Sequence, residues 1–370
     1  MSVRVVHVTN AYAPHSGGIR TTVHALGRGY AERGHEMVLL VPGPASRDEQ
    51  HDWGRLVQLP GPRVPGTGGY RVLLDLSRVR RELDGLAPDR LEVSDRLSLR
   101  ALGPWARSAG VPSTVIAHER VDGLLRAHAH LPERTARSLA DRHNTTTAAA
   151  FDRVVATTRF AAEEFQRIEV PVAHVPLGVD LAAFPPGPGA GDDGPRIVLC
   201  SRISREKRPD LAVDALRVLR DNGTAARLVV AGDGPAMRGL QRRARDLPVT
   251  FLGHVQGRRQ VAELLGGADV VLAPGPVETF GLAALEALAS GTPVVASSTS
   301  ALAELVVGDA GRCAPPLPVA LAGAVQHVLA RPVARRRAAA RARAEEFTWD
   351  RTVETMLALH GAASPAERSA

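Results

Sequence analysis

The chain has 370 residues, of which 44% are hydrophobic and 23% are charged, and its formal net charge is +7. This length predicts two domains of a soluble protein, each large enough for its own core. The N-terminus lacks the pattern of a signal peptide, and no apolar run is long enough to span a membrane. Aromatic residues make up only 4%, and no known nucleic-acid-binding motif is present, so nucleic acid is not an expected partner.

The first half of the chain alternates short strands with helices. Strand-like runs are predicted at residues 3–10, 36–42, 91–94, 113–119 and 153–158. Helical periodicity is predicted over residues 21–33, 73–86, 133–150 and 159–167. The repeated strand–loop–helix order indicates right-handed parallel crossovers, and therefore a doubly wound sheet.

The second half repeats this order after a segment typical of a linker, 185–195, in which glycine and proline dominate. Strands are predicted at 196–201, 226–231, 269–274 and 293–297, with helices at 211–223, 235–246, 258–268 and 279–291. An arginine-rich segment, 331–347, precedes an amphipathic terminal helix. That segment is either a solvated helix face or, alternatively, a contact for acidic lipid.

Lys207 is the only lysine in the chain, and it follows Arg202 by five residues in the loop "SRISREK" after a predicted strand. A guanidinium fork and a compact ammonium group can bind one pyrophosphate together. Its retention in an arginine-rich chain favours a role that arginine would not fill, with chance survival as the alternative.

The segment "PVETFGLAALEALASGTPVV", 276–295, is the strongest pattern in the sequence. Glu278 lies in a loop before a helix that carries Glu286. A helix N-terminus suits phosphate, and both carboxylates can accept hydrogen bonds from sugar or ribose hydroxyls. Alternatively, Glu278 complements the helix dipole and Glu286 is a surface residue. That helix is apolar almost all round, so Glu286 is expected to be buried or in a cleft.

This pattern, Glu278-x7-Glu286 with Phe280-Gly281 between, resembles the donor-site signature of retaining glycosyltransferases of family 4. Further motifs agree in order along essentially the whole chain: Gly17-Gly18, "VPLGVDLAAF", "VVAGDGP", "FLGHV" and "SGTPVVAS". The resemblance implies an α/β fold of the GT-B type, with two doubly wound Rossmann-like domains facing across a deep cleft. It implies an acceptor-binding domain at 1–184, a nucleotide-sugar-binding domain at 195–347, and a C-terminal helix within 348–370 that packs back on the first domain.

By the same resemblance, Arg202 and Lys207 hold the diphosphate of a nucleotide-sugar and, with His118 and Glu278, are the expected catalytic residues. His118 is expected to hydrogen-bond a sugar hydroxyl; a purely structural role is the alternative. The further donor-binding residues are Gly17, Gly18, Gly232, Gly234, Gly253, Val255, Thr279, Phe280, Gly281, Leu282 and Glu286. The acceptor-binding candidates are Arg20, Tyr70, Asp95, Glu119 and Arg120. Surface ion pairs are the alternative for Asp95, Glu119 and Arg120.

A narrower resemblance concerns segments such as "LEVSDRLSLRALG" and "HERVDGLL", which are similar to actinobacterial mannosyltransferases that act on phosphatidylinositol mannosides. It implies GDP-mannose as donor, no metal cofactor, and a mannosylated phosphatidylinositol as acceptor. No covalent nucleophile is evident, so a front-face displacement is expected. Alternatives are another nucleotide-sugar donor, and another glycolipid, polysaccharide or small-molecule acceptor. More distant alternatives are a nucleotide-sugar epimerase, a phosphorylase, or a non-enzymatic basic protein that binds lipid or nucleic acid.

The expected location is the cytoplasm, with peripheral contact to anionic phospholipid on the inner face of the membrane. Cys200 and Cys313 lack disulfide-framework or metal-ligand spacing, which predicts a reducing compartment. The predicted helix 73–86 carries Arg78, Arg80 and Arg81 and would suit a lipid surface. Alternatively, it is an ordinary helix that packs its apolar face on the sheet.

Overall fold

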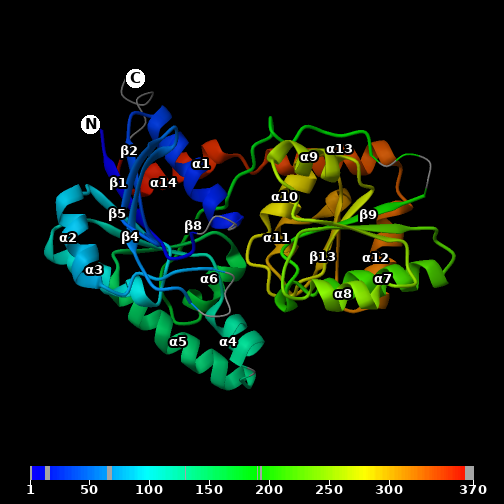
Figure 1. Cartoon of the computed structure of the whole chain (residues 1–370), viewed down its shortest axis with the longest axis horizontal. Helices are drawn as coiled ribbons and strands as arrows, with labels where there is room; N and C mark the ends of the chain where they lie inside the picture. Colours follow the sequence, from blue (N-terminus) through cyan, green and yellow to red (C-terminus); the bar gives the residue numbers. More distant parts are fainter. Residues whose placement is uncertain are drawn as a thin grey trace. The chain divides into compact units, whose positions relative to one another are not determined.

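The computed structural model describes residues 2–12, 17–64, 69–129, 131–189, 191 and 194–362. The chain divides into two compact units: unit 1 comprises Met1–Gly178 and Trp349–Ala370, and unit 2 comprises Val179–Thr348. Each unit is a largely parallel sheet covered by helices (Figure 1). None of the helices in the described ranges has the length and apolarity that crossing a membrane requires.

Unit 1 contains an eight-stranded sheet in the order β3-β4-β2-β1-β5-β6-β7-β8, parallel except for the β3–β4 pair. Its strands are β1 Arg4–Val8, β2 Glu36–Gly43, β3 Arg47–His51, β4 Gly54–Pro60, β5 Arg90–Val93, β6 Ser113–Ala117, β7 Arg153–Ala156 and β8 Ala173–His174. Its helices are α1 Gly18–Glu32, α2 Leu76–Leu86, η1 Ser98–Ala101, α3 Leu102–Ser108, α4 Val121–Ala129, α5 Glu133–Ala150, α6 Arg159–Gln166 and α14 Trp349–Leu359.

Successive residues of the central strands face opposite sides of this sheet, as strand geometry requires. On one side, Val6 of β1 packs in the same core as Leu83 of α2. On the other side, Val5 of β1 shares a core with residues of α1 and with Val353 of α14. The last helix of the chain thus packs beside α1 on unit 1 (Figure 1).

Helix α2 packs its apolar face on the sheet, which confirms the second of the two alternatives for the segment 73–86. Val79 and Leu83 are buried in the core, while Arg81 is exposed. The helix begins at Leu76, later than predicted, because the Asp75 side chain accepts a hydrogen bond from the Arg78 amide at 3.0 Å and caps the first turn.

Unit 2 contains a six-stranded, fully parallel sheet in the order β11-β10-β9-β12-β13-β14. The strands are β9 Arg196–Cys200, β10 Arg227–Ala231, β11 Val249–Gly253, β12 Val270–Ala273, β13 Val294–Ser297 and β14 Gly311–Ala314. The helices are η2 Arg205–Lys207, α7 Pro209–Asp221, α8 Met237–Arg243, α9 Arg258–Gly266, α10 Leu282–Ala289, α11 Leu302–Leu305, η3 Gly308–Ala310, α12 Pro318–Leu329 and α13 Val333–Glu345. Helices α7, α8 and α12 lie on one face, and α9, α10 and α13 on the other (Figure 1).

The order of strands in unit 2 reverses between β9 and β12, because β10 follows β9 on one side and the chain then returns to place β12 on the other. In open α/β sheets, ligands bind outside the carboxyl ends of the strands at such a switch point. The loops that follow β9 and β12 are therefore the expected ligand-binding loops of this unit.

Helix α13 uses its arginines inside unit 2, so both sequence-based alternatives for the arginine-rich segment were wrong for these side chains. Arg337 donates hydrogen bonds at 2.7–3.1 Å to four carbonyl oxygens, those of Gly187, Gly266, Ala268 and Ser290. Arg336 is buried and forms an ion pair with Asp269 at 3.0 Å. Carbonyls beyond helix ends need donors, and a long guanidinium stem reaches them from a neighbouring helix.

Candidate active site

The switch point of unit 2 brings together two loops that are far apart in the sequence. The loop after β9 contains Lys207, the loop after β12 contains Glu278, and Lys207 Nζ donates to Glu278 Oε2. Their side chains are 27% and 22% exposed, so the pair is partly accessible to a ligand. A Cβ at Gly275 would lie 3.2 Å from the Lys207 Cα, so this position leaves little room for a side chain. Two catalytic candidates from separate motifs thus contact each other.

Arg202 lies in the same loop as Lys207, and its side chain is exposed. Within the described part of the chain, its guanidinium has no hydrogen bond or ion pair. An exposed, unengaged guanidinium beside a partly buried ammonium leaves two cationic groups for one anionic ligand. The electrostatics of this loop therefore suit a diphosphate.

The predicted donor-binding glycines of β10 have a structural reason in the ligand-free protein. A Cβ on Gly232 would lie 1.9 Å from the Ser201 carbonyl oxygen, and one on Gly234 would lie 2.4 Å from that of Ile203. The Gly232 amide also donates to the Gly253 carbonyl at 2.7 Å. These glycines let the loops after β9, β10 and β11 pack backbone to backbone, and Val255 follows in the β11 loop.

The segment from Thr279 to Leu282 forms the entry to helix α10. Gly281 is the N-cap residue with φ +82°, a left-handed conformation that favours glycine, and a Cβ there would lie 2.3 Å from the Leu302 side chain. Phe280 is buried, with 6% of its surface exposed. The backbone of this entry is therefore fixed by packing, and the Glu278 carbonyl accepts from the Ala301 amide at 2.9 Å.

Glu286 lies on α10 near Cys200, and it is partly buried, as the sequence predicted. Among the described residues, no hydrogen bond or ion pair to its carboxylate is present. Burial raises the pKa of Glu286 to about 7, although the charge of Arg258 acts in the opposite direction. A carboxylate without a protein partner is costly to bury, so a ligand hydroxyl would relieve this cost.

This raised pKa predicts a pH-dependent effect of Glu286→Gln on stability. The folded protein holds the Glu286 proton up to about pH 7, whereas the unfolded chain loses it near its ordinary pKa, so ionised Glu286 destabilises the fold above pH 7. The variant should be more stable than the unchanged protein by about 1–3 kcal/mol at pH 8 and by much less at pH 5. Urea unfolding at both pH values measures this, and a difference that does not grow with pH would contradict it.

The predicted residues of unit 1 gather at the carboxyl ends of β1, β5 and β6, which are neighbours in the sheet. Asp95, after β5, accepts from Asn10 Nδ2 at 2.9 Å and from the Leu97 amide at 2.8 Å. His118, after β6, forms a hydrogen bond at 2.9 Å through Nε2 with Ser94 Oγ. Asn10 and Ser94 were missed from the sequence; polar residues directly after two predicted strands were the available signal.

His118 is partly exposed, and its ring is neutral at physiological pH. Burial, together with the nearby charges of His7 and Arg96, lowers the pKa of His118 to about 3, while Glu92 acts in the opposite direction. A neutral imidazole has one N–H donor and one acceptor, and one of its nitrogens is already used by Ser94. The other nitrogen can hydrogen-bond a hydroxyl group, but the ring is a poor proton acceptor.

Glu119 and Arg120 follow His118 and differ in environment. Glu119 is exposed, and its backbone carbonyl accepts from the Arg96 guanidinium. Arg120 forms a bidentate pair with Asp122 at 3.0 Å and an ion pair with Glu163 at 2.6 Å. The alternative of an ion pair therefore holds for Arg120 in the ligand-free protein.

Three further candidates of unit 1 belong to loops around the same edge. Gly17 is the N-cap residue of α1, and Gly18 begins that helix. The guanidinium of Arg20, in the first turn of α1, lies over the Tyr12 ring at 5.9 Å from its centroid. Tyr70 accepts from the Val64 amide at 2.8 Å through its backbone carbonyl.

Gly17 offers a test of ligand approach that is separate from stability. A Cβ at this position would meet no atom within 4 Å, and φ is −78°, so alanine fits the ligand-free protein. Gly17→Ala should leave thermal unfolding unchanged and reduce glycosyl transfer about tenfold or more, because the methyl group would occupy space near a bound phosphate. Gly85→Ala, on the exposed side of α2 with equally open space, should leave both unchanged. Full activity in Gly17→Ala would contradict the assignment.

Beneath this edge lies a buried polar cluster that was not predicted from the sequence. Glu92 of β5 accepts from His7 Nδ1 at 2.7 Å, from His360 Nε2 at 2.7 Å and from the Tyr30 hydroxyl at 2.8 Å. Glu92 and His7 are register partners in β5 and β1, while His360 comes from the end of α14. The cluster joins the sheet to the first and last helices of unit 1.

Comparison with known proteins assigns the chain to a family. The "Glycosyltransferase Family 4" description matches residues 16–183, and the "Glycosyl transferases group 1" description matches residues 194–331. The GDP-mannose-dependent alpha-(1-6)-phosphatidylinositol dimannoside mannosyltransferase of Mycobacterium tuberculosis is 49% identical over 99% of this chain and 98% of the relative. A D-inositol 3-phosphate glycosyltransferase of Actinosynnema mirum is 34% identical over 69% of this chain and 67% of the relative. The chain is a glycosyltransferase of this family.

Solved structures show the same fold at low sequence identity. Sucrose-phosphate synthase from Thermosynechococcus elongatus matches with a TM-score of 0.77 and 22% identity, covering 97% of this chain and 98% of the other. Anabaena HepE, in complex with UDP and glucose, matches with a TM-score of 0.75 and 16% identity, covering 98% of this chain and 100% of the other. The predicted GT-B class, with two Rossmann-like α/β domains, is confirmed.

Proposed function

We propose that the chain is a retaining mannosyltransferase that moves mannose from GDP-mannose to a mannosylated phosphatidylinositol. The observation that carries the proposal is the 49% identity, over nearly the whole of both chains, to a relative named for this type of reaction. The ion pair between Lys207 and Glu278 at the unit 2 switch point supports it, because it places two motif residues where a nucleotide-sugar would bind.

In the proposed reaction, the bond between the mannose C1 and the phosphate oxygen of GDP breaks as the acceptor hydroxyl attacks from the same face. The acceptor proton passes to the leaving phosphate, so no separate protein base is needed. Arg202 and Lys207 stabilise the charge that develops on GDP, and this proposal includes no metal ion. His118 hydrogen-bonds a donor sugar hydroxyl, and Glu286 accepts from another hydroxyl of the nucleotide-sugar.

The proposed acceptor is a lipid, so we place the enzyme as a peripheral protein on the cytoplasmic face of the membrane. Leu74, which is 62% exposed before α2, and the exposed Arg81 on that helix support contact with anionic lipid. Co-sedimentation with phosphatidylinositol-containing vesicles, and not with neutral vesicles, is the expected result.

Product analysis tests the proposed reaction. The purified chain is incubated with GDP-mannose, GDP-glucose or UDP-glucose, each with a phosphatidylinositol mannoside, with phosphatidylinositol, or without acceptor. We expect GDP release and the addition of one α-linked mannose only with GDP-mannose and the mannosylated lipid, measured by mass and by linkage analysis. Transfer from a uridine donor, an inverted anomeric configuration, or no gain in GDP release with the lipid would contradict the proposal.

A further inference from the structure

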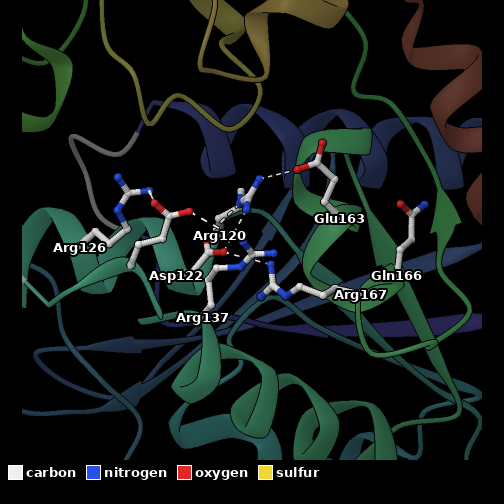
Figure 2. A pocket seen from close by; sticks show the side chains of 8 residues that line it. Arg120, Asp122, Arg126, Arg137, Glu163, Gln166 and Arg167 are labelled. Carbon is white, nitrogen blue, oxygen red and sulfur yellow. Dashed lines mark hydrogen bonds and ion pairs between the residues drawn. The ribbon is translucent and has the colours of Figure 1, made fainter. Parts of the chain in front are cut away.

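A polar cavity in unit 1 lies beside the candidate acceptor residues. Its volume is about 380 Å³, within the range of roughly 300–1,000 Å³ that small-molecule sites occupy. It is enclosed by residues from the loop before α4 and from helices α4, α5 and α6 (Figure 2). The lining residues are Arg120, Asp122, Arg126, Glu133, Arg137, Glu163, Gln166 and Arg167. All are charged or amide side chains, so the cavity suits a polar ligand.

The inner part of this cavity is rigid. Asp122 is buried and receives hydrogen bonds from Arg120 at 3.0 Å and from Arg167 at 3.3 Å. The fully buried Glu164 accepts from the Val121 amide at 3.0 Å and from the Asp122 amide at 2.7 Å. The start of α4 is thus fixed to α6, and its arginines keep their positions without a ligand.

The outer part of the cavity is under-neutralised. Arg126 and Arg137 both approach Glu133, but their closest N–O distances are 4.0 and 3.8 Å, beyond hydrogen-bond length. Their side chains are 56% and 50% exposed, compared with 17% for Arg120. Four guanidinium groups line the cavity with three carboxylates, which leaves a formal excess of one positive charge.

This gradient from closed to open pairs distinguishes the cavity from a self-contained surface network. Figure 2 shows Arg126, Arg137 and Arg120 around the same space. A guanidinium group has donors in a planar fork that matches the oxygens of a phosphate, and two such groups can hold one phosphate together. Glu133, shared weakly between two arginines, is the group that an incoming anion would replace.

We propose that this cavity binds a phosphate ester, with Arg126 and Arg137 as its recognition residues. The acceptor link rests on the proposed function, since a phosphatidylinositol mannoside carries a phosphodiester in its headgroup. Arg120 is two residues from His118, so their Cα atoms are at most about 7 Å apart, and one headgroup can reach both. A free phosphorylated small molecule is the other source of the same chemistry.

Calorimetric binding to three soluble probes tests this: a glycerophosphoinositol mannoside, the same mannoside without phosphate, and inositol phosphate. The unchanged protein should bind the phosphate-bearing mannoside about tenfold more tightly than its phosphate-free form. The variant Arg126→Ala/Arg137→Ala should lose that preference. Arg134→Ala, an exposed arginine of α5 outside the cavity, should keep it.

Glu133→Gln supplies a result that a purely structural role would not give. Removing the competing carboxylate should tighten binding of the phosphate-bearing probe severalfold, while thermal unfolding of all four variants stays close to that of the unchanged protein. Inositol phosphate binding that needs Arg126 and Arg137, without a preference among the mannosides, would support the site and assign it to a free phosphate ester. No phosphate preference for any probe would overturn the proposal.

These binding measurements need no mannosyl transfer, so they separate the cavity from the reaction. Failure of transfer with intact phosphate preference would count against the proposed function and leave the phosphate site standing. Transfer to the lipid with no effect of Arg126→Ala/Arg137→Ala on binding would support the function and overturn the site.

Discussion

Lys207→Ala should reduce the turnover number about 100- to 1,000-fold, because removing one preorganised group that stabilises transition-state charge has an effect of this size. Its free energy of unfolding should change by no more than about 1 kcal/mol, since Lys207 and Glu278 are both partly exposed to water. Initial rates of GDP release and urea unfolding measure the two quantities.

Two further variants sharpen this test. Arg205→Ala removes an exposed cation from the same 3-10 turn and should leave turnover close to normal. Lys207→Arg keeps the positive charge but replaces a compact ammonium with a broad fork, so it should also slow turnover. Normal turnover in Lys207→Ala would remove the loop after β9 from the mechanism, whatever the other variants do.

Glu92→Gln should reduce the free energy of unfolding by about 3–5 kcal/mol, the typical cost of breaking a buried charged pair. Glu92 is fully buried and accepts from two histidines and a tyrosine, and an amide cannot accept all of these hydrogen bonds. Glu36→Gln, at a surface pair with Arg4, should cost only about 0–1 kcal/mol. Equal effects in the two variants would contradict the importance of the buried cluster.

The same cluster gives a pH dependence with a defined sign. Burial alone would raise the pKa of Glu92, but hydrogen bonds from His360 and His7 hold it well below its usual range. A depressed carboxyl pKa stabilises the fold above the pKa of the unfolded chain, and this stabilisation is lost as pH falls. The difference in stability between the unchanged protein and Glu92→Gln should therefore persist near neutral pH and shrink below about pH 4, as measured by urea unfolding.

Several elements of the fold could be predicted because their patterns are local. Helix α5 occupies the predicted range 133–150, and β12 and α10 lie where the apolar run and the following helical pattern placed them. Strand β3 was missed because Arg47–His51 is polar and mostly exposed at the sheet edge, without the apolar alternation that marks a half-buried strand. Local patterning thus identified buried elements and overlooked an edge.

Long-range contacts of arginines and carboxylates were not predictable. The residues of α13 read as a solvated face because composition cannot show where a long side chain ends, and Arg337 ends on backbone carbonyls of other segments. Similarly, Glu92 and His360 are 268 positions apart, and nothing local marks either as a buried partner of the other.

By itself, the sequence determined the class of the protein: the order of strands and helices, and the identity and spacing of Arg202, Lys207, Glu278 and Glu286. Those features follow from short-range periodicity and from motifs in which the required chemistry lies within a few residues. Only the tertiary structure decided which of these side chains meet, that Glu286 lacks a protein partner, and that Arg126 and Arg137 border one cavity. Such contacts depend on sheet order and on the packing of distant helices, which side-chain chemistry along the chain does not encode locally.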